Sequence, residues 1–158
     1  MKSKDQSSQV QLINFIRENS SFSRREIMKQ LISGNIKVNQ HIATDANQLL
    51  HDTDDVYIKD ILIKKQLLRY YKFNKPINVI STFQDPSNRR DLSYFINKYR
   101  LPKTLRPCGR LDRYSSGLLL FSNDGNFINH VLHPTFSINK TYEIKLNKSL
   151  EFTHKTQL

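Results

Sequence analysis

A loop of charged and turn-forming residues leads directly into a continuous apolar run in the second half of this 158-residue chain. The run, residues 117–122, has the length of a buried β-strand, and Asn123-Asp124-Gly125 after it is typical of a turn. Asp112 stands in the loop before the strand. Catalytic groups are commonly held in loops beside rigid elements, so Asp112 is a candidate catalytic residue. An ordinary loop ion pair with Arg110 or Arg113 explains the same residue types.

The rest of the second half mixes extended and helical patterns, which predicts an α+β fold. Residues 67–73 and 77–82 are expected to be extended, with Pro76 between them. Apolar positions recur with helical spacing from Leu92 to Tyr99. A short helix is expected through residues 127–132, and the alternation in residues 141–146 predicts a final strand.

The first half predicts a small unit of two helices and three short strands. The first helix follows the apolar residues from Val10 to Ile16. The second begins at Ser23, where Glu26 completes a capping box, and ends at Gly34.

Three short strands are expected after the second helix. Residues 36–42 read as two paired strands with a turn at Asn39-Gln40, and residues 56–58 read as a third. We therefore place one domain at residues 9–59, a linker at 60–66 and a second domain at 67–158.

The charge of the chain favours a polyanionic partner. Lys and Arg outnumber Asp and Glu by 25 to 14, which gives a formal net charge of +11. Nucleic acid is the first candidate, because each neutralised phosphate releases counterions. The single cysteine, Cys108, cannot form an internal disulfide, and no apolar stretch has the length of a membrane span. We therefore expect a cytoplasmic protein with no membrane partner.

Several cations gather around the second predicted helix and the strand that follows it. The candidate RNA-binding residues are Ser23, Arg24, Arg25, Lys29 and Lys37. The segment SRREIMKQLISGNIKVNQ that contains them resembles the S4 domain, an RNA-binding module of ribosomal proteins and RNA-modifying enzymes. Gln40 departs from that pattern, because it stands where the turn glycine of such domains is usual. A charge run that only solvates a helix surface is the other interpretation.

The chain also resembles the pseudouridine synthases that modify ribosomal RNA and carry an N-terminal S4 domain. The resemblance rests on GRLDRYSSGLLLFSNDG, together with Asn74-Lys75-Pro76, Ser81-Thr82 and Lys140-Thr141-Tyr142. It implies a small S4-like domain followed by the N-terminal part of a mixed, largely antiparallel-sheet catalytic domain. Relatives of this kind continue well beyond the Lys-x-Tyr segment, so we expect about half of the catalytic sheet to be absent from a chain that ends at Leu158.

The resemblance also implies roles for particular side chains. Asp112 falls on the essential Asp, which acts as a nucleophile on the target uridine while the C–N glycosidic bond is cleaved and the base rotates and re-attaches through carbon. Arg110 is expected to support that carboxylate or to fill the space left by the displaced base. Tyr142 is expected to stack on the uracil, unless it is simply a core residue. Lys140 is expected to meet a phosphate or the carboxylate, unless it is an ordinary surface lysine.

Two functions follow from these expectations. The first is an isomerase that needs no cofactor or metal and acts as a monomer on ribosomal RNA. The alternative is a catalytically inert, shortened RNA-binding protein that works through its S4-like domain. An experiment can distinguish the two functions, because only the isomerase depends on Asp112.

Overall fold

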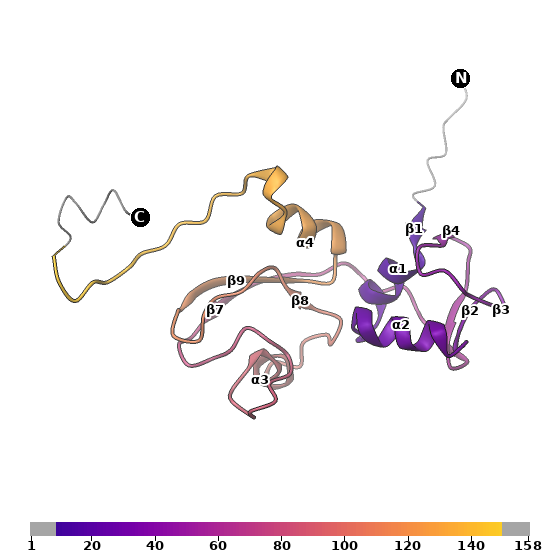
Figure 1. Ribbon diagram of the computed structural model, residues 1–158, viewed down its shortest axis with the longest axis horizontal. Coiled ribbons are helices and arrows are strands. Elements are labelled where there is room, and N and C mark those ends of the chain that lie inside the picture. The colour runs from indigo at the N-terminus through magenta and orange to yellow at the C-terminus, as the bar shows by residue number, and fades with distance from the viewer. Residues whose placement is uncertain (1–8, 150–158) are drawn as a thin grey trace, which may run out of the picture.

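The structure is a computed structural model that describes residues 9–149 (Figure 1). Within that range the chain forms an N-terminal part and a second part, each with its own cluster of buried apolar residues. The polar residues 1–8 and the last residues of the predicted second domain, 150–158, lie outside the described range.

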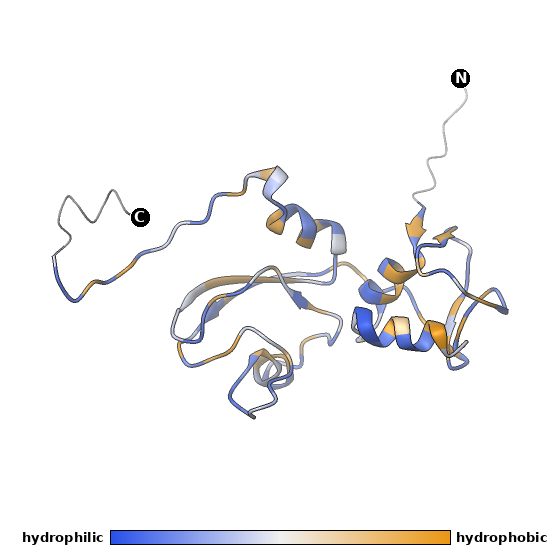
Figure 2. Ribbon diagram, viewed as in Figure 1, coloured by the Kyte–Doolittle hydropathy of each residue, from blue (hydrophilic) through white to orange (hydrophobic). Residues whose placement is uncertain are grey.

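The N-terminal part packs two helices on small antiparallel sheets. The helices are α1 (Leu12–Asn19) and α2 (Arg24–Ile32). One sheet has the order β3-β2-β5-β6, and the other pairs β1 with β4. The strand bounds are β1 Val10–Gln11, β2 Ile36–Val38, β3 His41–Ile42, β4 Leu49–Leu50, β5 Val56–Ile58 and β6 Ile61–Leu62. Figure 2 shows α2 changing from hydrophilic at its basic first turn to hydrophobic at its C-terminal end.

The caps and turns that the sequence predicts for this part are confirmed. The Ser23 hydroxyl accepts from the Glu26 backbone N–H (3.3 Å), and the Glu26 carboxylate accepts from the Ser23 N–H (2.7 Å). Gly34 has a positive φ of 65° just beyond α2. Asn39 and Gln40 both have positive φ, as a tight two-residue hairpin requires.

Two details of the N-terminal part differ from the prediction. Val10 belongs to β1 and not to the first helix, which begins at Leu12. The segment 60–66, predicted to be a linker, contains β6, which pairs with β5. A second two-residue hairpin makes this pairing possible, because Lys59 and Asp60 also adopt positive φ. Neither residue is a glycine or an asparagine, so the sequence carries no strong hairpin signal there.

The second part is a three-stranded antiparallel sheet with helices on its two faces (Figure 1). The sheet has the order β7-β9-β8, with β7 Tyr70–Lys75, β8 Arg106–Pro107 and β9 Gly117–Ser122. Helix α3 (Leu92–Lys98) lies on one face, and α4 (Gly125–Leu132) with the 3₁₀ helix η1 (Pro134–Phe136) lies on the other. The buried apolar residues between α3 and the sheet are Val79, Leu92, Ile96, Leu105, Leu119 and Phe121.

The strand predicted at residues 117–122 is confirmed, but the extended segment expected at residues 77–82 and the strand predicted at residues 141–146 are wrong. Residues 77–82 hold only an isolated bridge, between Ile80 and Asp91. Residues 141–146 pair with no strand of the described chain, and their side chains are exposed. The alternation of Tyr142, Ile144 and Leu146 does suit a strand. A strand also requires a neighbour that offers its backbone N–H and C=O groups, and residues 9–149 supply none at this position.

Polar contacts join the two parts where α1 and the turn after it meet β8 and the end of β9. The Arg106 guanidinium donates to the carbonyls of Ser21 (3.0 Å) and Phe22 (3.3 Å). The Glu18 carboxylate accepts from the Gly125 N–H (3.2 Å) at the start of α4. Buried Asn123 donates to the Glu18 carbonyl at 3.4 Å. These contacts fix the basic helix α2 relative to the sheet that carries Asp112.

Among the described helices, none has the length and apolar content that a membrane crossing requires.

Candidate active site

Asp112 lies in the loop between β8 and β9, and its side chain is exposed. Glycines with positive φ stand on both sides of it, Gly109 at 105° and Gly117 at 131°, in a region that disfavours other residues. A Cβ at Gly109 would also approach a methyl of Leu132 to 3.2 Å. Within the loop, the Ser115 N–H donates to the Asp112 carbonyl (3.1 Å) and closes a turn. The two glycines thus allow the chain to leave and re-enter the sheet sharply around the carboxylate.

The last residue of β7 and the segment that follows it hold this loop at three successive places. The Lys75 ammonium donates to the Ser115 carbonyl at 2.8 Å. The Asn78 backbone N–H donates to the Arg113 carbonyl at 2.7 Å. The Ser81 hydroxyl donates to the Leu111 carbonyl (2.6 Å) and accepts from the Leu111 N–H (3.1 Å). Asp112 therefore sits on a loop whose backbone is fixed on both sides of it.

Lys75 is the unusual member of this set, because its side chain is fully buried. Buried lysines are rare and need partners, and here the ammonium donates to both the Ser115 and the Pro76 carbonyls. Burial lowers the pKa of Lys75, and the nearby Asp112 carboxylate opposes that shift. The buried charge thus acts on the Asp112 loop both through a hydrogen bond and through the field that it places near the carboxylate.

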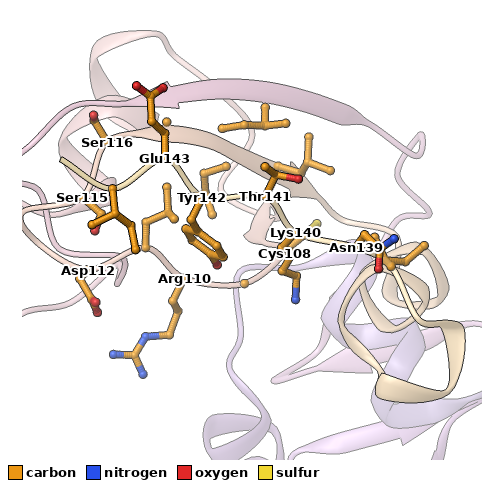
Figure 3. A pocket seen from close by; sticks show the side chains of 18 of the residues that line it. Cys108, Arg110, Asp112, Ser115, Ser116, Asn139, Lys140, Thr141, Tyr142 and Glu143 are labelled. Carbon is orange, nitrogen blue, oxygen red and sulfur yellow. The ribbon is translucent and has the colours of Figure 1, made fainter. Parts of the chain in front are cut away.

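An open cavity of about 1070 Å³ lies beside the loop (Figure 3). It is bounded by the Asp112 loop, by β9 and by the exposed residues 138–145. The four residues that the sequence singles out for catalysis and substrate binding all line it: Arg110, Asp112, Lys140 and Tyr142. In Figure 3 the Tyr142 ring lies between the Asp112 loop and Lys140, with Arg110 leaving the loop next to Asp112. Because residues 141–146 form no strand, Tyr142 and Lys140 reach the cavity from an extended segment.

The Asp112 carboxylate forms no ion pair with Arg110 or Arg113 within the described part of the chain. Arg113 lies instead over the ring of Tyr114, with its guanidinium carbon 5.3 Å from the ring centre. The structure therefore does not have the local ion pair that would make Asp112 an ordinary loop residue.

The predicted RNA-binding residues are only partly brought together. Arg24, Arg25 and Lys29 line an open groove on α2 together with Met28, Ile32 and Ser33. The hydroxyl of Ser23 is engaged in capping α2. Lys37 is not part of the groove, because it lies on β2 and pairs with Asp60 at 2.8 Å.

The sequence prediction missed the supporting residues Lys75 and Ser81. Lys75 stands in the Asn74-Lys75-Pro76 segment, but a lysine at a strand end is ordinarily expected to be exposed. Ser81 stands in the Ser81-Thr82 segment that contributes to the family resemblance, but its role was not predicted, since it depends on the approach of Leu111, 30 residues later. Among residues 9–149, no cluster of His, Cys, Asp or Glu could hold a metal ion.

Comparison with known proteins places this arrangement in a family. The family described as RNA pseudouridylate synthase matches residues 69–158. Ribosomal large subunit pseudouridine synthase B of Bacillus subtilis is 34% identical over 78% of this chain and 50% of that protein. The dual-specificity RNA pseudouridine synthase RluF of Escherichia coli is 31% identical over 90% of this chain and 49% of that protein.

The chain thus spans about half the length of the curated relatives that it matches. A crystal structure of a pseudouridylate synthase aligns with 80% of this chain and 54% of that chain, at 26% identity and a TM-score of 0.43. The family match alone covers residues 69–158, more than half of the chain, and includes the Asp112 loop and the cavity beside it. The chain belongs to the RNA pseudouridylate synthase family.

Proposed function

We propose that this chain isomerises a uridine of ribosomal RNA to pseudouridine, with Asp112 as the nucleophile. The observation that carries the proposal is the position of Asp112, exposed at a cavity on a loop that Lys75, Asn78 and Ser81 fix in place. A carboxylate attacks without prior deprotonation, so its placement is the main requirement. The substrate class is supported by membership of the RNA pseudouridylate synthase family and by the name of the Bacillus subtilis relative, which refers to the ribosomal large subunit.

The reaction needs the glycosidic bond to break and a carbon–carbon bond to form. In the proposed course, the Asp112 carboxylate bonds to C1′ while the bond between C1′ and N1 of uracil breaks. The base then rotates, and C5 bonds to C1′ as the bond between C1′ and Asp112 breaks, which regenerates the carboxylate. The C5 proton leaves and N1 takes up a proton. Atoms balance with no cofactor or metal.

The other cavity residues have roles that suit their chemistry. A planar guanidinium such as that of Arg110 can occupy the place of the displaced base, and the exposed ring of Tyr142 can stack on the uracil. Lys140 lies beside Tyr142 and suits contact with a phosphate.

We assign RNA docking to the N-terminal part as an S4-like domain, which the pairing of β6 with β5 extends beyond the predicted boundary at residue 59, with the catalytic domain from 67 onward. The groove formed by Arg24, Arg25 and Lys29 on α2 supports this assignment, as does the net charge of +11. Ser23 would act mainly through the helix cap, and Lys37 as a further cation on β2. An enzyme of this kind would act on the RNA as a monomer in the cytoplasm.

The direct test is incubation of the chain with unmodified ribosomal RNA, followed by carbodiimide labelling and mapping of reverse-transcription stops. The unaltered chain should produce a new stop, and Asp112→Ala should not, while both bind the RNA equally. Asp52→Asn is the matched control, because it removes an exposed carboxylate of the N-terminal part that pairs with Lys65. Absence of a stop with RNA binding intact would favour the inert RNA-binding alternative.

A further inference from the structure

Helix α3 and the residues at its two ends present two exposed tyrosines next to two cations. We call Arg90, Tyr94, Lys98 and Tyr99 the tyrosine patch. Tyr94 is 44% exposed and Tyr99 is 55% exposed. The Arg90 guanidinium carbon lies 4.8 Å from the centre of the Tyr94 ring, and the Lys98 ammonium lies 5.9 Å from it. The Lys98 ammonium is also 5.6 Å from the centre of the Tyr99 ring.

The rings of both tyrosines pack against Phe95, which in turn contacts the sheet. Phe95 lies edge-on to Tyr94 with ring centres 5.1 Å apart, and it stacks with Tyr99 at 6.4 Å. On its other side Phe95 packs against Phe73 of β7, at 4.9 Å. The exposed rings are therefore fixed to the sheet through Phe95, so little conformational entropy remains to be lost when a ligand stacks on them.

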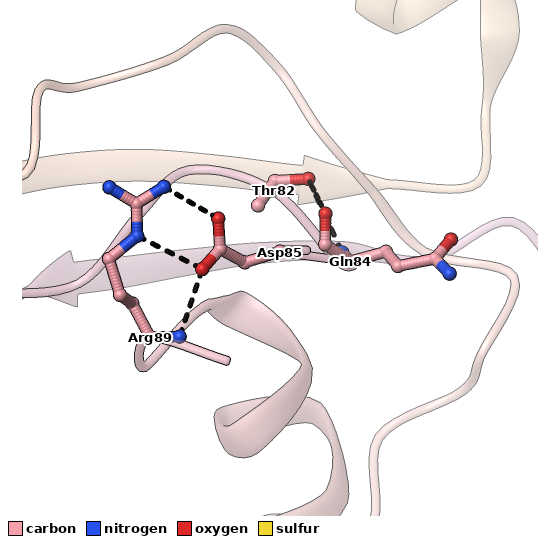
Figure 4. Close-up of polar contacts among 4 residues, drawn as sticks. All are labelled: Thr82, Gln84, Asp85 and Arg89. Atoms are coloured by element: carbon pink, nitrogen blue, oxygen red, sulfur yellow. Dashed lines mark hydrogen bonds and ion pairs between the residues drawn. The ribbon is translucent and has the colours of Figure 1, made fainter. Parts of the chain in front are cut away.

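The surroundings of the patch are strongly cationic. Residues 89–103 contain Arg89, Arg90, Lys98, Arg100 and Lys103. Their nearby carboxylates are engaged locally: Asp85 pairs with Arg89 at 2.7 Å (Figure 4), and buried Asp91 caps α3. Such a surface attracts a polyanion more strongly than it attracts a neutral protein or a protein with few acidic residues.

The patch adjoins the Asp112 loop. The carbonyl of Arg90, a patch residue, accepts from the Ile80 N–H at 3.0 Å. The next residue, Ser81, forms hydrogen bonds with both backbone groups of Leu111, the residue directly before Asp112. An RNA strand that reaches Asp112 can continue over this surface toward α3.

We propose that the tyrosine patch binds unpaired nucleotides next to the target uridine, with Tyr94 and Tyr99 stacking on bases and Arg90 and Lys98 contacting phosphates. This inference rests on the proposed function, because it takes ribosomal RNA as the ligand. Single-stranded RNA is recognised by stacking on aromatic rings and by cations along its backbone, and both groups are present here on α3 and the residues that flank it. A duplex hides its base faces, so the patch discriminates against it.

The test is equilibrium binding of a labelled single-stranded RNA of about 12 nucleotides, and of the same sequence as a duplex, to the full chain. Tyr94→Ala/Tyr99→Ala should weaken binding of the single strand by about 5- to 100-fold and leave duplex binding unchanged. Tyr94→Phe/Tyr99→Phe is the matched control and should bind as the unaltered chain does, because the ring faces remain.

The cations are tested through the salt dependence. Lys98→Gln should reduce the slope of log affinity against log salt by about 0.7, the value for one phosphate contact to a single strand. Lys64→Gln removes the same charge from a surface outside the patch, and it should leave the slope unchanged. This pair keeps the proposal testable if the double alanine variant fails to fold.

The outcomes separate this inference from the proposed function. Equal single-strand binding by the unaltered chain and the double alanine variant overturns the patch, as does an equal loss in the phenylalanine variant. Patch-dependent binding by a chain that makes no pseudouridine supports the patch and overturns the proposed function. Pseudouridine formation by a chain whose RNA binding does not depend on the patch residues supports the proposed function and overturns the patch.

Discussion

The hydroxyl of Ser81 both donates to and accepts from the backbone of Leu111, the residue directly before Asp112, at 2.6 Å and 3.1 Å. Ser81 is buried, and it comes from a segment 30 residues earlier in the chain. A single hydroxyl thus satisfies both backbone groups of Leu111 and fixes the direction in which the chain enters Asp112. Together with Lys75 and Asn78, it makes the Asp112 loop a supported structure and not a free connection.

Ser81→Ala should lower the free energy of unfolding by about 1–3 kcal/mol, because it leaves the N–H and C=O of Leu111 without their partner. If Asp112 is the nucleophile, the turnover rate should also fall by about 10- to 100-fold, since a small displacement of a reacting group is costly. RNA affinity should not change. Thr82→Ala is the control, because within residues 9–149 the Thr82 hydroxyl forms hydrogen bonds only with Gln84 in its own turn (Figure 4). Equal rates in the two variants would contradict the account.

Lys75→Met should destabilise the chain by about 1–3 kcal/mol in urea denaturation, because the Ser115 and Pro76 carbonyls lose a charged donor. Methionine fills most of the same volume, so little of the effect comes from a cavity. Lys72→Met changes an exposed lysine of the same strand and should leave stability nearly unaltered. A stability loss shared by both variants would show that Lys75 has no special role.

The free energy of unfolding of Glu18→Gln, relative to that of the unaltered chain, should increase as the pH rises. Burial raises the pKa of Glu18, while the Gly125 N–H opposes that shift. The folded state therefore binds the proton more tightly than the unfolded state, and the unaltered chain loses stability as the pH passes upward through the raised pKa. Glutamine keeps an acceptor for the Gly125 N–H and carries no charge.

The measurement for Glu18 is chemical denaturation of both forms at about pH 4 and about pH 7. The stability difference between variant and unaltered chain should shift in favour of the variant at the higher pH. Glu143→Gln, at an exposed position, serves as the control and should show no such shift. A difference for Glu18→Gln that is constant with pH would contradict the assignment.

Arg106→Lys should weaken the link between the two parts of the chain. The guanidinium reaches the carbonyls of both Ser21 and Phe22, and an ammonium on a lysine lacks the fork that spans two acceptors. We expect a loss of about 1–2 kcal/mol and a broader or divided thermal transition. Arg100→Lys is the control, since Arg100 is exposed. One sharp transition at the original temperature in the Arg106 variant would be the contrary result.

Local signals in the sequence were sufficient for the features that depend on neighbouring residues. The capping box of Ser23 and Glu26, the positive φ at Gly34 and the hairpin at Asn39-Gln40 each arise within a few residues. The strand at residues 117–122 follows from its own apolar run. The position of Asp112 in a loop beside that strand follows from the same segment.

The features that the sequence did not predict depend on distant partners. The burial of Lys75 requires the Ser115 carbonyl, 40 residues later, to be in reach. Residues 141–146 alternate as a strand does but find no ladder partner within the described chain. The strand β6 requires the left-handed pair Lys59-Asp60, which local preferences disfavour. Tertiary context decided each of these cases.

The most direct test of the central claim is release of tritium from ribosomal RNA labelled at C5 of uridine. Formation of the bond between C5 and C1′ expels the C5 hydrogen, so the released label counts isomerisation events. The unaltered chain should release tritium, and Asp112→Asn, which keeps the shape of the side chain and removes its charge, should release none above RNA alone. Release by Asp112→Asn at the unaltered rate, or no release by a chain that binds the RNA, would contradict the assignment of Asp112 as the nucleophile of an active enzyme.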